Sequence, residues 1–363
     1  MLFVCFVDPN SDLRMKALFA PDWRDGVPYQ RLLAEALAAH GIAVGFLRDY
    51  RRILPLTRLV RDWQRTHGCD ILHLHWPEAY YPRLGDGRDW WRCARFSTDL
   101  ALATRHCALA VTAHNLHAHN RADEPFAFHN TRAAFRRARI VFAHSEAAAV
   151  LIAATYGVRE ERIAVIPHGD LSVAMPPPVP RDEARARLAL GDEKIVLMFG
   201  AVEPYKGIED TLAHWRAASP DATLVVCGKP FTPAYGESIA SAAHGIPRVV
   251  LRLARLSDSE LADWLSAADA VLFNYRTIFT SGAASLARSW GIPLLLPAHL
   301  RTVDLAEPSP RVFRFGGFGA NFAGQLRCAL ETPPDFSAAA PWRAETSWPE
   351  VARLTAEGYA RVV

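Results

Sequence analysis

Two hydroxyl side chains and a glycine lie together between two apolar segments of residues 271–297, VLFNYRTIFTSGAASLARSWGIPLLLP. Thr280, Ser281 and Gly282 follow an apolar run and precede AASLARSW, which is rich in helix-forming residues. A helix that begins at such a turn presents unpaired backbone N–H groups and the positive end of its dipole to an anion. The turn is therefore a candidate for binding a diphosphate. The same residues could instead only cap the helix, and that alternative stays open.

The elements that must position this turn alternate along the chain between short apolar runs and helical patterns. This alternation indicates a doubly wound α/β protein whose parallel strands are buried on both faces. Ligands of such sheets bind at the carboxyl ends of the strands, where polar residues occur in this sequence. In the first half of the chain, the predicted strands are Leu2–Val7, Ile42–Phe46, Asp70–His75, Ala108–Ala113, Ile140–His144 and Ile163–Ile166.

A second α/β series follows a proline-rich segment. Residues 173–182, VAMPPPVPRD, predict a stiff interdomain linker, and the strand KIVLMFG begins at Lys194. The run SDSELADWLSAAD predicts a helix capped by Ser257 and Glu260, and a terminal helix is expected to begin near Pro349. We therefore predict an N-terminal domain over 1–172 together with the helix 347–363, and a C-terminal domain over 183–346.

The composition argues against several classes of function. The 363 residues carry a net charge of +3, which is too small to indicate nucleic-acid binding. They contain no apolar run that is long enough to span a membrane, so we expect a soluble, cytoplasmic protein. Six cysteines without a CxxC pair indicate neither a zinc site nor disulfides. His114, His117 and His119 are close in sequence but lack the spacing of HExxH, so no metal is expected.

Basic residues concentrate in residues 48–67, RDYRRILPLTRLVRDWQRTH, which contain six arginines and two aspartates. Tryptophans and arginines recur in residues 90–96, WWRCARF. Basic residues mixed with aromatic and leucine side chains suit an anionic membrane surface. A solvated helix face rich in arginine is the alternative.

Several of these motifs together resemble the GT-B nucleotide-sugar glycosyltransferases over nearly the whole chain. The motifs are VLMFGAVEPYKGIEDTL, VIPHGDL and the strand, loop and GIP unit of residues 271–297. The finer pattern HLHWPE, HNLHAHN, FGAVEPYKG and YRTIFTSGAASLARSWGIP is similar to bacterial exopolysaccharide glycosyltransferases, in particular the xanthan-pathway β-mannosyltransferase group. The resemblance implies two Rossmann-like domains facing across a cleft, with the C-terminal helix returning to the N-terminal domain. It also implies a donor held mainly by the C-terminal domain and an acceptor held by the N-terminal one.

The resemblance also implies roles for individual residues. Lys206 matches the family lysine that pairs with the donor diphosphate, and the alternative is a lysine exposed in a PYKG turn. His114 matches a histidine that faces the donor sugar or phosphates, and the alternative is a histidine bonded to neighbouring loop backbone. The implied donor-binding residues are Lys206, Gly228, Leu256, Tyr275, Arg276, Thr280, Ser281 and Gly282, and the acceptor-binding residues are Trp76, Tyr80 and Asn115.

The sequence departs from the family at the glutamate pair that retaining members carry as E-x7-E. Aligned on the GIP motif, those positions hold Ile278 and Leu286, which cannot bond a sugar hydroxyl. Their absence favours inversion of configuration, in which one general base deprotonates the acceptor hydroxyl. Glu78 is the first candidate for this base and His114 the second, although Glu78 could instead only cap the next helix.

These inferences predict a glycosyltransferase that moves one sugar, with mannose from GDP-mannose as one candidate, to a polyprenyl-diphosphate-linked oligosaccharide. The expected place is the inner face of the cell membrane, in exopolysaccharide biosynthesis. No cofactor or metal is expected, because no DxD motif is present to hold a metal against the diphosphate. A retaining transferase, a nucleotide-sugar epimerase and a catalytically silent sugar-nucleotide-binding subunit are the alternatives.

Overall fold

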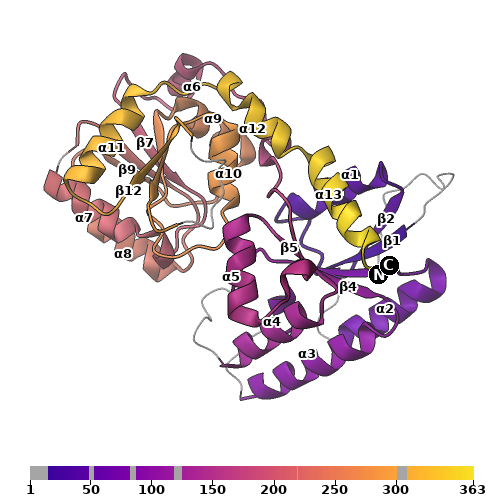
Figure 1. Cartoon of the computed structure of the whole chain (residues 1–363). Helices are drawn as coiled ribbons and strands as arrows, with labels where there is room; N and C mark the ends of the chain where they lie inside the picture. The colour runs from indigo at the N-terminus through magenta and orange to yellow at the C-terminus, as the bar shows by residue number, and fades with distance from the viewer. Residues whose placement is uncertain (1–14, 49–52, 82–86, 118–124, 219, 301–308) are drawn as a thin grey trace. The chain divides into compact units, whose positions relative to one another are not determined.

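The computed structural model describes residues 15–48, 53–81, 87–117, 125–218, 220–300 and 309–363. The chain divides into two compact units (Figure 1). The first unit comprises the described residues up to Gly169 together with Thr346–Val363, and the second comprises those of Asp170–Glu345. Each unit is built on its own parallel sheet.

The first unit contains a six-stranded parallel sheet, sheet A, in the order β2-β1-β3-β4-β5-β6. Strands extend on both sides of β1, which is the doubly wound arrangement predicted from the sequence. The strands are β1 (Met15–Ala20), β2 (Ile42–Phe46), β3 (Ile71–Leu74), β4 (Ala108–Thr112), β5 (Ile140–Ala143) and β6 (Ile163–Val165). The helices are α1 (Tyr29–Ala38), α2 (Pro55–Thr66), α3 (Asp89–Ala103), α4 (Pro125–Arg137), α5 (Glu146–Tyr156) and α13 (Trp348–Ala360).

The strand β1 was not predicted from the sequence. The predicted strand Leu2–Val7 lies outside the described residues. The sequence of β1, MKALFA, begins with a methionine and a lysine and contains two alanines, so its composition fits a helix as well as a strand. It becomes a strand because it pairs with β2 on one side and β3 on the other, and its last four residues are buried.

The C-terminal helix α13 belongs to the first unit and packs beside α1 (Figure 1). Gly358 lets this helix approach the sheet closely, because a Cβ atom there would lie 2.5 Å from the ring of Phe142. Near its end, the hydroxyl of Tyr359 is 2.5 Å from Nδ1 of His73 in β3. The predicted return of the C-terminal helix to the N-terminal domain is confirmed.

The second unit contains another six-stranded parallel sheet, sheet B, in the order β12-β11-β10-β7-β8-β9. Its strands are β7 (Ile195–Phe199), β8 (Thr223–Cys227), β9 (Val249–Arg252), β10 (Ala270–Leu272), β11 (Leu294–Pro297) and β12 (Val312–Phe315). Its helices are α6 (Arg181–Arg187), α7 (Ile208–Ala218), α8 (Pro233–Ala243), α9 (Asp258–Ala267), α10 (Gly282–Ser289), α11 (Ala320–Glu331) and α12 (Ala340–Glu345). The predicted capping box of α9 forms between Ser257 and Glu260.

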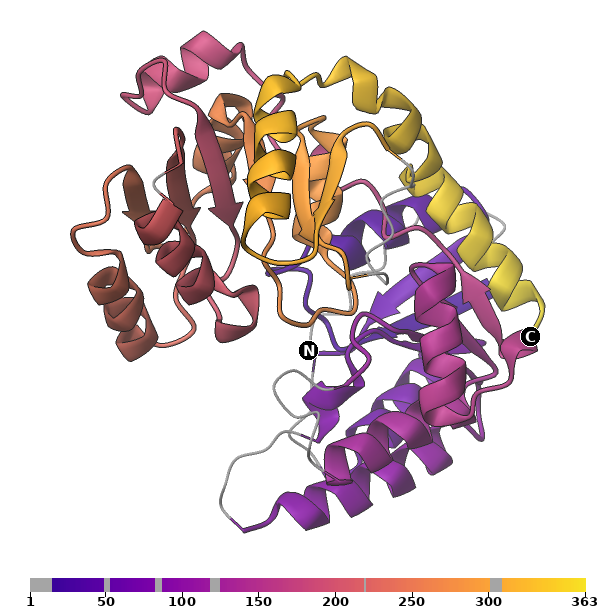
Figure 2. The same ribbon diagram turned by 60° about the vertical axis from the view of Figure 1, so that its left-hand side comes forward.

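Both faces of sheet B are buried, as its continuous apolar strands predict. Alternate residues of β7 enter different cores: Ile195 and Leu197 join one, and Val196 and Met198 join the other. The first core includes residues of α9 and α10, and the second includes residues of α7, α8 and α11 (Figure 2). Among the described residues, no helix has both the length and the apolar character needed to cross a membrane.

Candidate functional site

The carboxyl ends of β7 and β8 meet at two glycines. Gly200 follows β7 and Gly228 follows β8, and a Cβ atom on Gly228 would lie 1.9 Å from the carbonyl oxygen of Gly200. Both glycines have positive φ angles, +88° and +149° respectively. Only glycine satisfies this backbone and this contact together. Of the two glycines, Gly228 is predicted from the sequence and Gly200 is not, because its only signal is its place at the end of a predicted strand.

Lys206 lies beside this glycine pair, and its side chain is buried with 6% exposure. Its Nζ donates a hydrogen bond to the carbonyl oxygen of Phe199 at 2.9 Å and lies 5.7 Å from the ring centroid of Tyr275. Burial lowers the pKa of the ammonium group from 10.5 to about 8. The negative charge of Glu203 opposes this lowering, although no carboxylate of the described residues lies within ion-pair distance of Nζ. The alternative of an exposed lysine is therefore wrong.

The Thr280–Gly282 turn is linked to Lys206 through Tyr275. The Tyr275 hydroxyl lies 3.4 Å from Oγ of Ser281, which accepts a hydrogen bond from the backbone N–H of Ala284 at 3.1 Å. Ser281 thus caps α10, as the sequence predicts, while Thr280 lies half-buried beside it. The cap occupies one N–H group of the first turn and leaves the positive end of the helix dipole beside this tyrosine.

Two other predicted donor-binding residues lie differently. The guanidinium of Arg276 forms an ion pair with Asp210 of α7 at 3.0 Å and turns to the surface, where about half of it is exposed. Its backbone N–H, by contrast, donates to the carbonyl oxygen of Tyr205 at 2.7 Å. Leu256 packs against the apolar core of the second unit. In the described part of the chain, neither of these two side chains shares a hydrogen bond or ring contact with Lys206, Tyr275 or Ser281.

In the first unit, the structure brings together Glu78 and Asn115. Glu78 lies in a short 3-10 helix, Pro77–Tyr80, that follows β3, and Asn115 follows β4. The Asn115 amide donates to Oε1 of Glu78 at 3.3 Å. Both border a small cavity of about 10 Å³, which also touches His75 and His114 and has room for roughly one water molecule. The carboxylate of Glu78 therefore accepts a hydrogen bond from a side chain.

His114, the second candidate base, is packed inside the unit with 7% exposure. Its ring stacks on Trp76 at a centroid distance of 4.5 Å, and Tyr29 meets it edge-on at 4.7 Å. Its ring nitrogens face the side chains of His75 and His144, so bonding to loop backbone is not its main environment. Burial, followed by the neighbouring histidines, holds the pKa of His114 well below its usual range, so the ring is neutral at pH 7.

The predicted binding of acceptor by Trp76 and Tyr80 does not match their burial. Tyr80 is 1% exposed, and Trp76 is 8% exposed with one ring face against His114 and contact with Trp23 at 4.8 Å. Aromatic side chains with this much apolar area pack into a core whenever the fold supplies one. Asn115 is the predicted acceptor residue that lies at the cavity.

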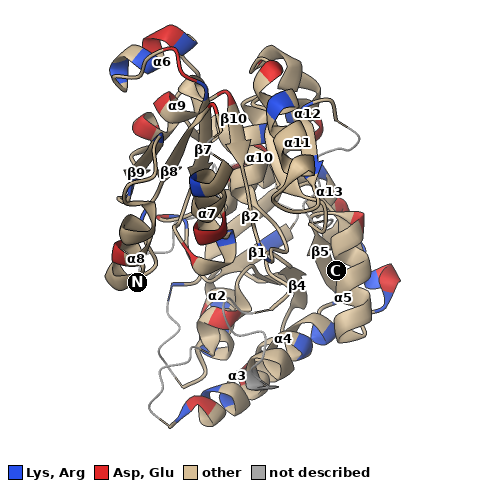
Figure 3. Ribbon diagram, turned by 90° about the vertical axis from the view of Figure 1, so that its left-hand side faces the viewer, with Lys and Arg blue, Asp and Glu red and all other residues tan. Residues whose placement is uncertain are grey.

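The basic segment predicted for the membrane is partly described. Arg51 and Arg52 lie outside the described residues. Helix α2 exposes Arg58 and Arg61 while it buries Leu59, Val60 and Trp63 on its other face. At the start of α3, Trp90 and Trp91 are 59% and 43% exposed. Acidic residues lie among the basic ones on α3 (Figure 3), so its surface is not uniformly positive.

Comparison with known proteins tests the family assignment. The model of Glycosyltransferase Family 4 matches residues 17–170. The GDP-mannose:glycolipid 4-beta-D-mannosyltransferase of Xanthomonas campestris pv. campestris is 30% identical over 168 residues, which are 44% of this chain and 46% of that protein. A second protein of the same name and species is 29% identical over the same share of both chains. This chain thus matches about half the length of these curated relatives.

Solved structures match the chain as a whole. Sucrose-phosphate synthase from Thermosynechococcus elongatus superposes with a TM-score of 0.69 at 19% identity, covering 96% of this chain and 99% of that chain. HepE from Anabaena in complex with UDP gives 0.71 at 16% identity, covering 96% and 100%. The fold is GT-B. The resemblance to GT-B glycosyltransferases and the predicted α/β class are therefore confirmed.

Proposed function

We propose that this GT-B protein transfers mannose from GDP-mannose to a lipid-linked oligosaccharide. The observation that carries the proposal is the buried Lys206 beside the capped start of α10, at the carboxyl edge of sheet B. A diphosphate is a compact double anion, and a buried cation next to a helix N-terminus is suited to hold it. The lysine is partly desolvated before donor binds, so less water must be removed when the diphosphate arrives.

The identity of the donor rests on the curated relatives, whose name states GDP-mannose as donor and a glycolipid as acceptor. HepE supports a nucleotide ligand in this fold because its structure contains UDP. For this chain, Gly200 and Gly228 support the same reading, since the two backbones approach closely at the carboxyl ends of β7 and β8, where ligands of such sheets bind.

We infer that transfer inverts the anomeric centre. Ile278 and Leu286 stand where retaining relatives carry glutamates, and both pack against the apolar core of the second unit. A single displacement then needs one base, for which Glu78 is the candidate. Its carboxylate takes the proton of the acceptor hydroxyl, the hydroxyl oxygen forms a bond to the anomeric carbon, and the bond to the diphosphate breaks with its electron pair leaving on GDP. Lys206 and the start of α10 stabilise the leaving charge, so no metal is required at the diphosphate.

The lipid part of the acceptor is the reason to expect contact with an anionic membrane. Arg58 and Arg61 are exposed on α2, which packs against α3, and α3 carries the exposed Trp90 and Trp91. Each exposed arginine contributes about 1 kcal/mol of attraction to an anionic surface. Replacing Arg58 and Arg61 by glutamine should lower co-sedimentation with phosphatidylserine vesicles, and salt should lower that of the wild type. Arg327→Gln on α11 of the other unit is the matched control, and equal sedimentation of all three proteins would contradict the membrane proposal.

Two measurements test the function itself. In a thermal-shift screen of nucleotide sugars, GDP-mannose at a hundred times its dissociation constant should stabilise the chain by roughly 2.7 kcal/mol. Release of GDP should then require a polyprenyl-diphosphate-linked oligosaccharide. Stabilisation without GDP release, with every acceptor, would indicate a silent binding subunit. A change of the sugar without acceptor would indicate an epimerase, and no stabilisation by any nucleotide sugar would contradict the proposal.

A further inference from the structure

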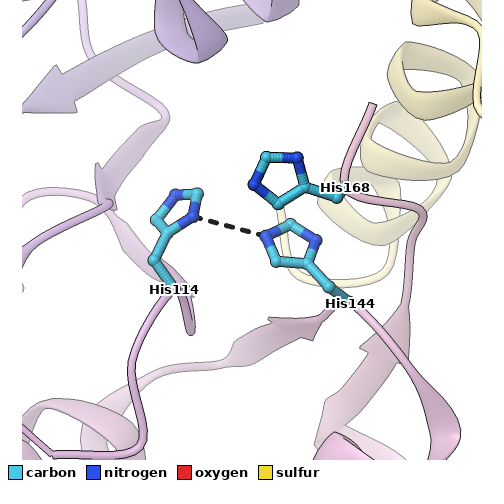
Figure 4. Close-up of side chains that lie close together, drawn as sticks. All are labelled: His114, His144 and His168. Atoms are coloured by element: carbon cyan, nitrogen blue, oxygen red, sulfur yellow. Dashed lines mark hydrogen bonds between the residues drawn. The ribbon is translucent and has the colours of Figure 1, made fainter. Parts of the chain in front are cut away.

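Four histidines stand at the carboxyl ends of four adjacent strands of sheet A. His75 follows β3, His114 follows β4, His144 follows β5 and His168 lies shortly after β6. Because the strands are parallel and neighbours in the sheet, these residues gather at one edge although they are far apart in sequence. The rings of His114, His144 and His168 face a common space (Figure 4), and one ring nitrogen from each lies within 4.8 Å of the other two.

The spacing of these nitrogens is close to that of metal ligands. Zinc binds imidazole nitrogen at about 2.0–2.1 Å in tetrahedral geometry, which places two ligand nitrogens roughly 3.3 Å apart. Nδ1 of His114 and Nε2 of His144 are 3.4 Å apart. The third nitrogen, from His168, must move by up to roughly 1.5 Å to complete the set, which a side-chain rotation provides. His168 is the least buried of the three, so its ring has the most freedom to do so.

The hydrogen bonds around the cluster leave suitable lone pairs. Nδ1 of His144 lies 3.3 Å from the carbonyl oxygen of Ile166, so this nitrogen carries the hydrogen and Nε2 carries the lone pair. Nδ1 of His168 is buried and has no hydrogen-bond partner among the described residues. A metal ion binds an imidazole through a nitrogen that carries a lone pair.

We propose that His114, His144 and His168 bind one zinc ion, with the fourth position left to water. Nδ1 of His75 lies 3.3 Å from Nε2 of His114, the ring nitrogen that does not face the proposed zinc ion. This contact orients the His114 ring as a ligand. When zinc takes Nδ1 of His114, the proton of this imidazole resides on Nε2 and is donated to His75. Each ring stays neutral, so binding shifts tautomers and releases no proton.

The surroundings of the cluster resemble the outer shell of a metal site. Tyr29 packs edge-on against both His114 and His168, and Trp76 covers a face of His114. Gly169, with φ +91°, lets the chain turn against the indole of Trp348, since a Cβ atom there would lie 2.6 Å from that ring. These aromatic side chains limit access of water and fix the rings of the ligands. All three proposed ligands lie within the first unit.

Two substitutions each remove one zinc-binding nitrogen and keep the hydrogen bond that the other nitrogen of the same ring makes. His144→Asn places an amide N–H near the position of Nδ1 and keeps the bond to Ile166, but it lacks Nε2. His114→Gln keeps a nitrogen near the position of Nε2, toward His75, but it lacks Nδ1. His106, which is exposed on the loop before β4, provides the matched control His106→Asn.

The experiment uses the untagged full-length chain, freed of metal with a chelator and titrated with Co²⁺ as a spectroscopic substitute for zinc. The wild type and His106→Asn should bind one equivalent with the visible absorption of tetrahedral cobalt, and zinc should displace it. Both ligand variants should bind at least about a hundred-fold more weakly. Circular dichroism identifies a variant that fails to fold, and in that case the test is whether zinc raises the melting temperature of the wild type and of His106→Asn equally. No stoichiometric binding by the wild type, or equal binding by folded ligand variants, would overturn the proposal and leave a hydrogen-bonded histidine network.

Discussion

The carboxyl edges of the two sheets differ in charge although both sheets are parallel and six-stranded. At the edge of sheet B, two glycines bring the backbones together, and Lys206 supplies a buried cation. At the edge of sheet A, neutral histidines and aromatic rings fill the corresponding strand ends, and Glu78 supplies a carboxylate. A parallel sheet provides only the location of a site. The residues at the strand ends decide whether that site attracts an anion or supplies a base.

This difference implies a division of labour between the two units. An anionic leaving group is best held by a buried cation, as at Lys206. A hydroxyl is best deprotonated by a carboxylate, and Glu78 supplies one that accepts a hydrogen bond from the uncharged amide of Asn115. Variants at the two edges should therefore affect different kinetic constants.

The largest expected effect concerns the chemical step. Glu78→Gln keeps the size of the side chain but cannot accept a proton, so the turnover number should fall by roughly a hundred-fold to ten-thousand-fold. Glu160→Gln, an exposed carboxylate of the same unit, should have no effect. Initial rates of GDP release at saturating donor measure both. A Glu78→Gln enzyme with normal turnover would remove this carboxylate from the chemistry.

A smaller effect is expected from closing the glycine contact of sheet B. Gly228→Ala places a methyl group against the carbonyl oxygen of Gly200 and should lower the free energy of unfolding by about 1–3 kcal/mol. Gly316→Ala is the control, because a Cβ atom there meets nothing within 4 Å. Urea denaturation of the two variants measures the difference. If both unfold at the same urea concentration, the close approach does not constrain the second unit.

The smallest expected effect is the pH dependence of donor affinity. The pKa of Lys206 is lowered by burial to about 8, so the charged form is present below pH 8 and is lost as the pH rises through it. Donor should therefore bind roughly tenfold more weakly at pH 9 than at pH 7. Titration of the guanine base also contributes near this pH, so Lys206→Ala is the control and should show a flatter profile. Identical profiles would mean that this ammonium group does not meet the diphosphate.

Local sequence patterns predicted the strands well where apolar runs were bounded by glycine or polar residues, as at Ile42–Phe46. They also predicted the capped start of helix α9. They missed β1, because MKALFA is a strand only through its two partners in the sheet. The same patterns grouped His114 with His117 and His119, which are near in sequence, and of these His119 lies outside the described residues. The structure brings His114 beside His144 and His168. Such a cluster depends on strand order, which no local spacing reveals.

Donor affinity, measured by calorimetric titration of GDP-mannose, tests the division between the units most directly. Lys206→Ala should weaken binding by about 1.5–3 kcal/mol, the scale of a charged hydrogen bond, because the cation at the edge of sheet B is lost. Glu78→Gln should bind donor within about twofold of the wild type, because its carboxylate lies in the first unit. Unchanged affinity in Lys206→Ala, or a comparable loss in Glu78→Gln, would contradict a donor site on the second unit with the base on the first.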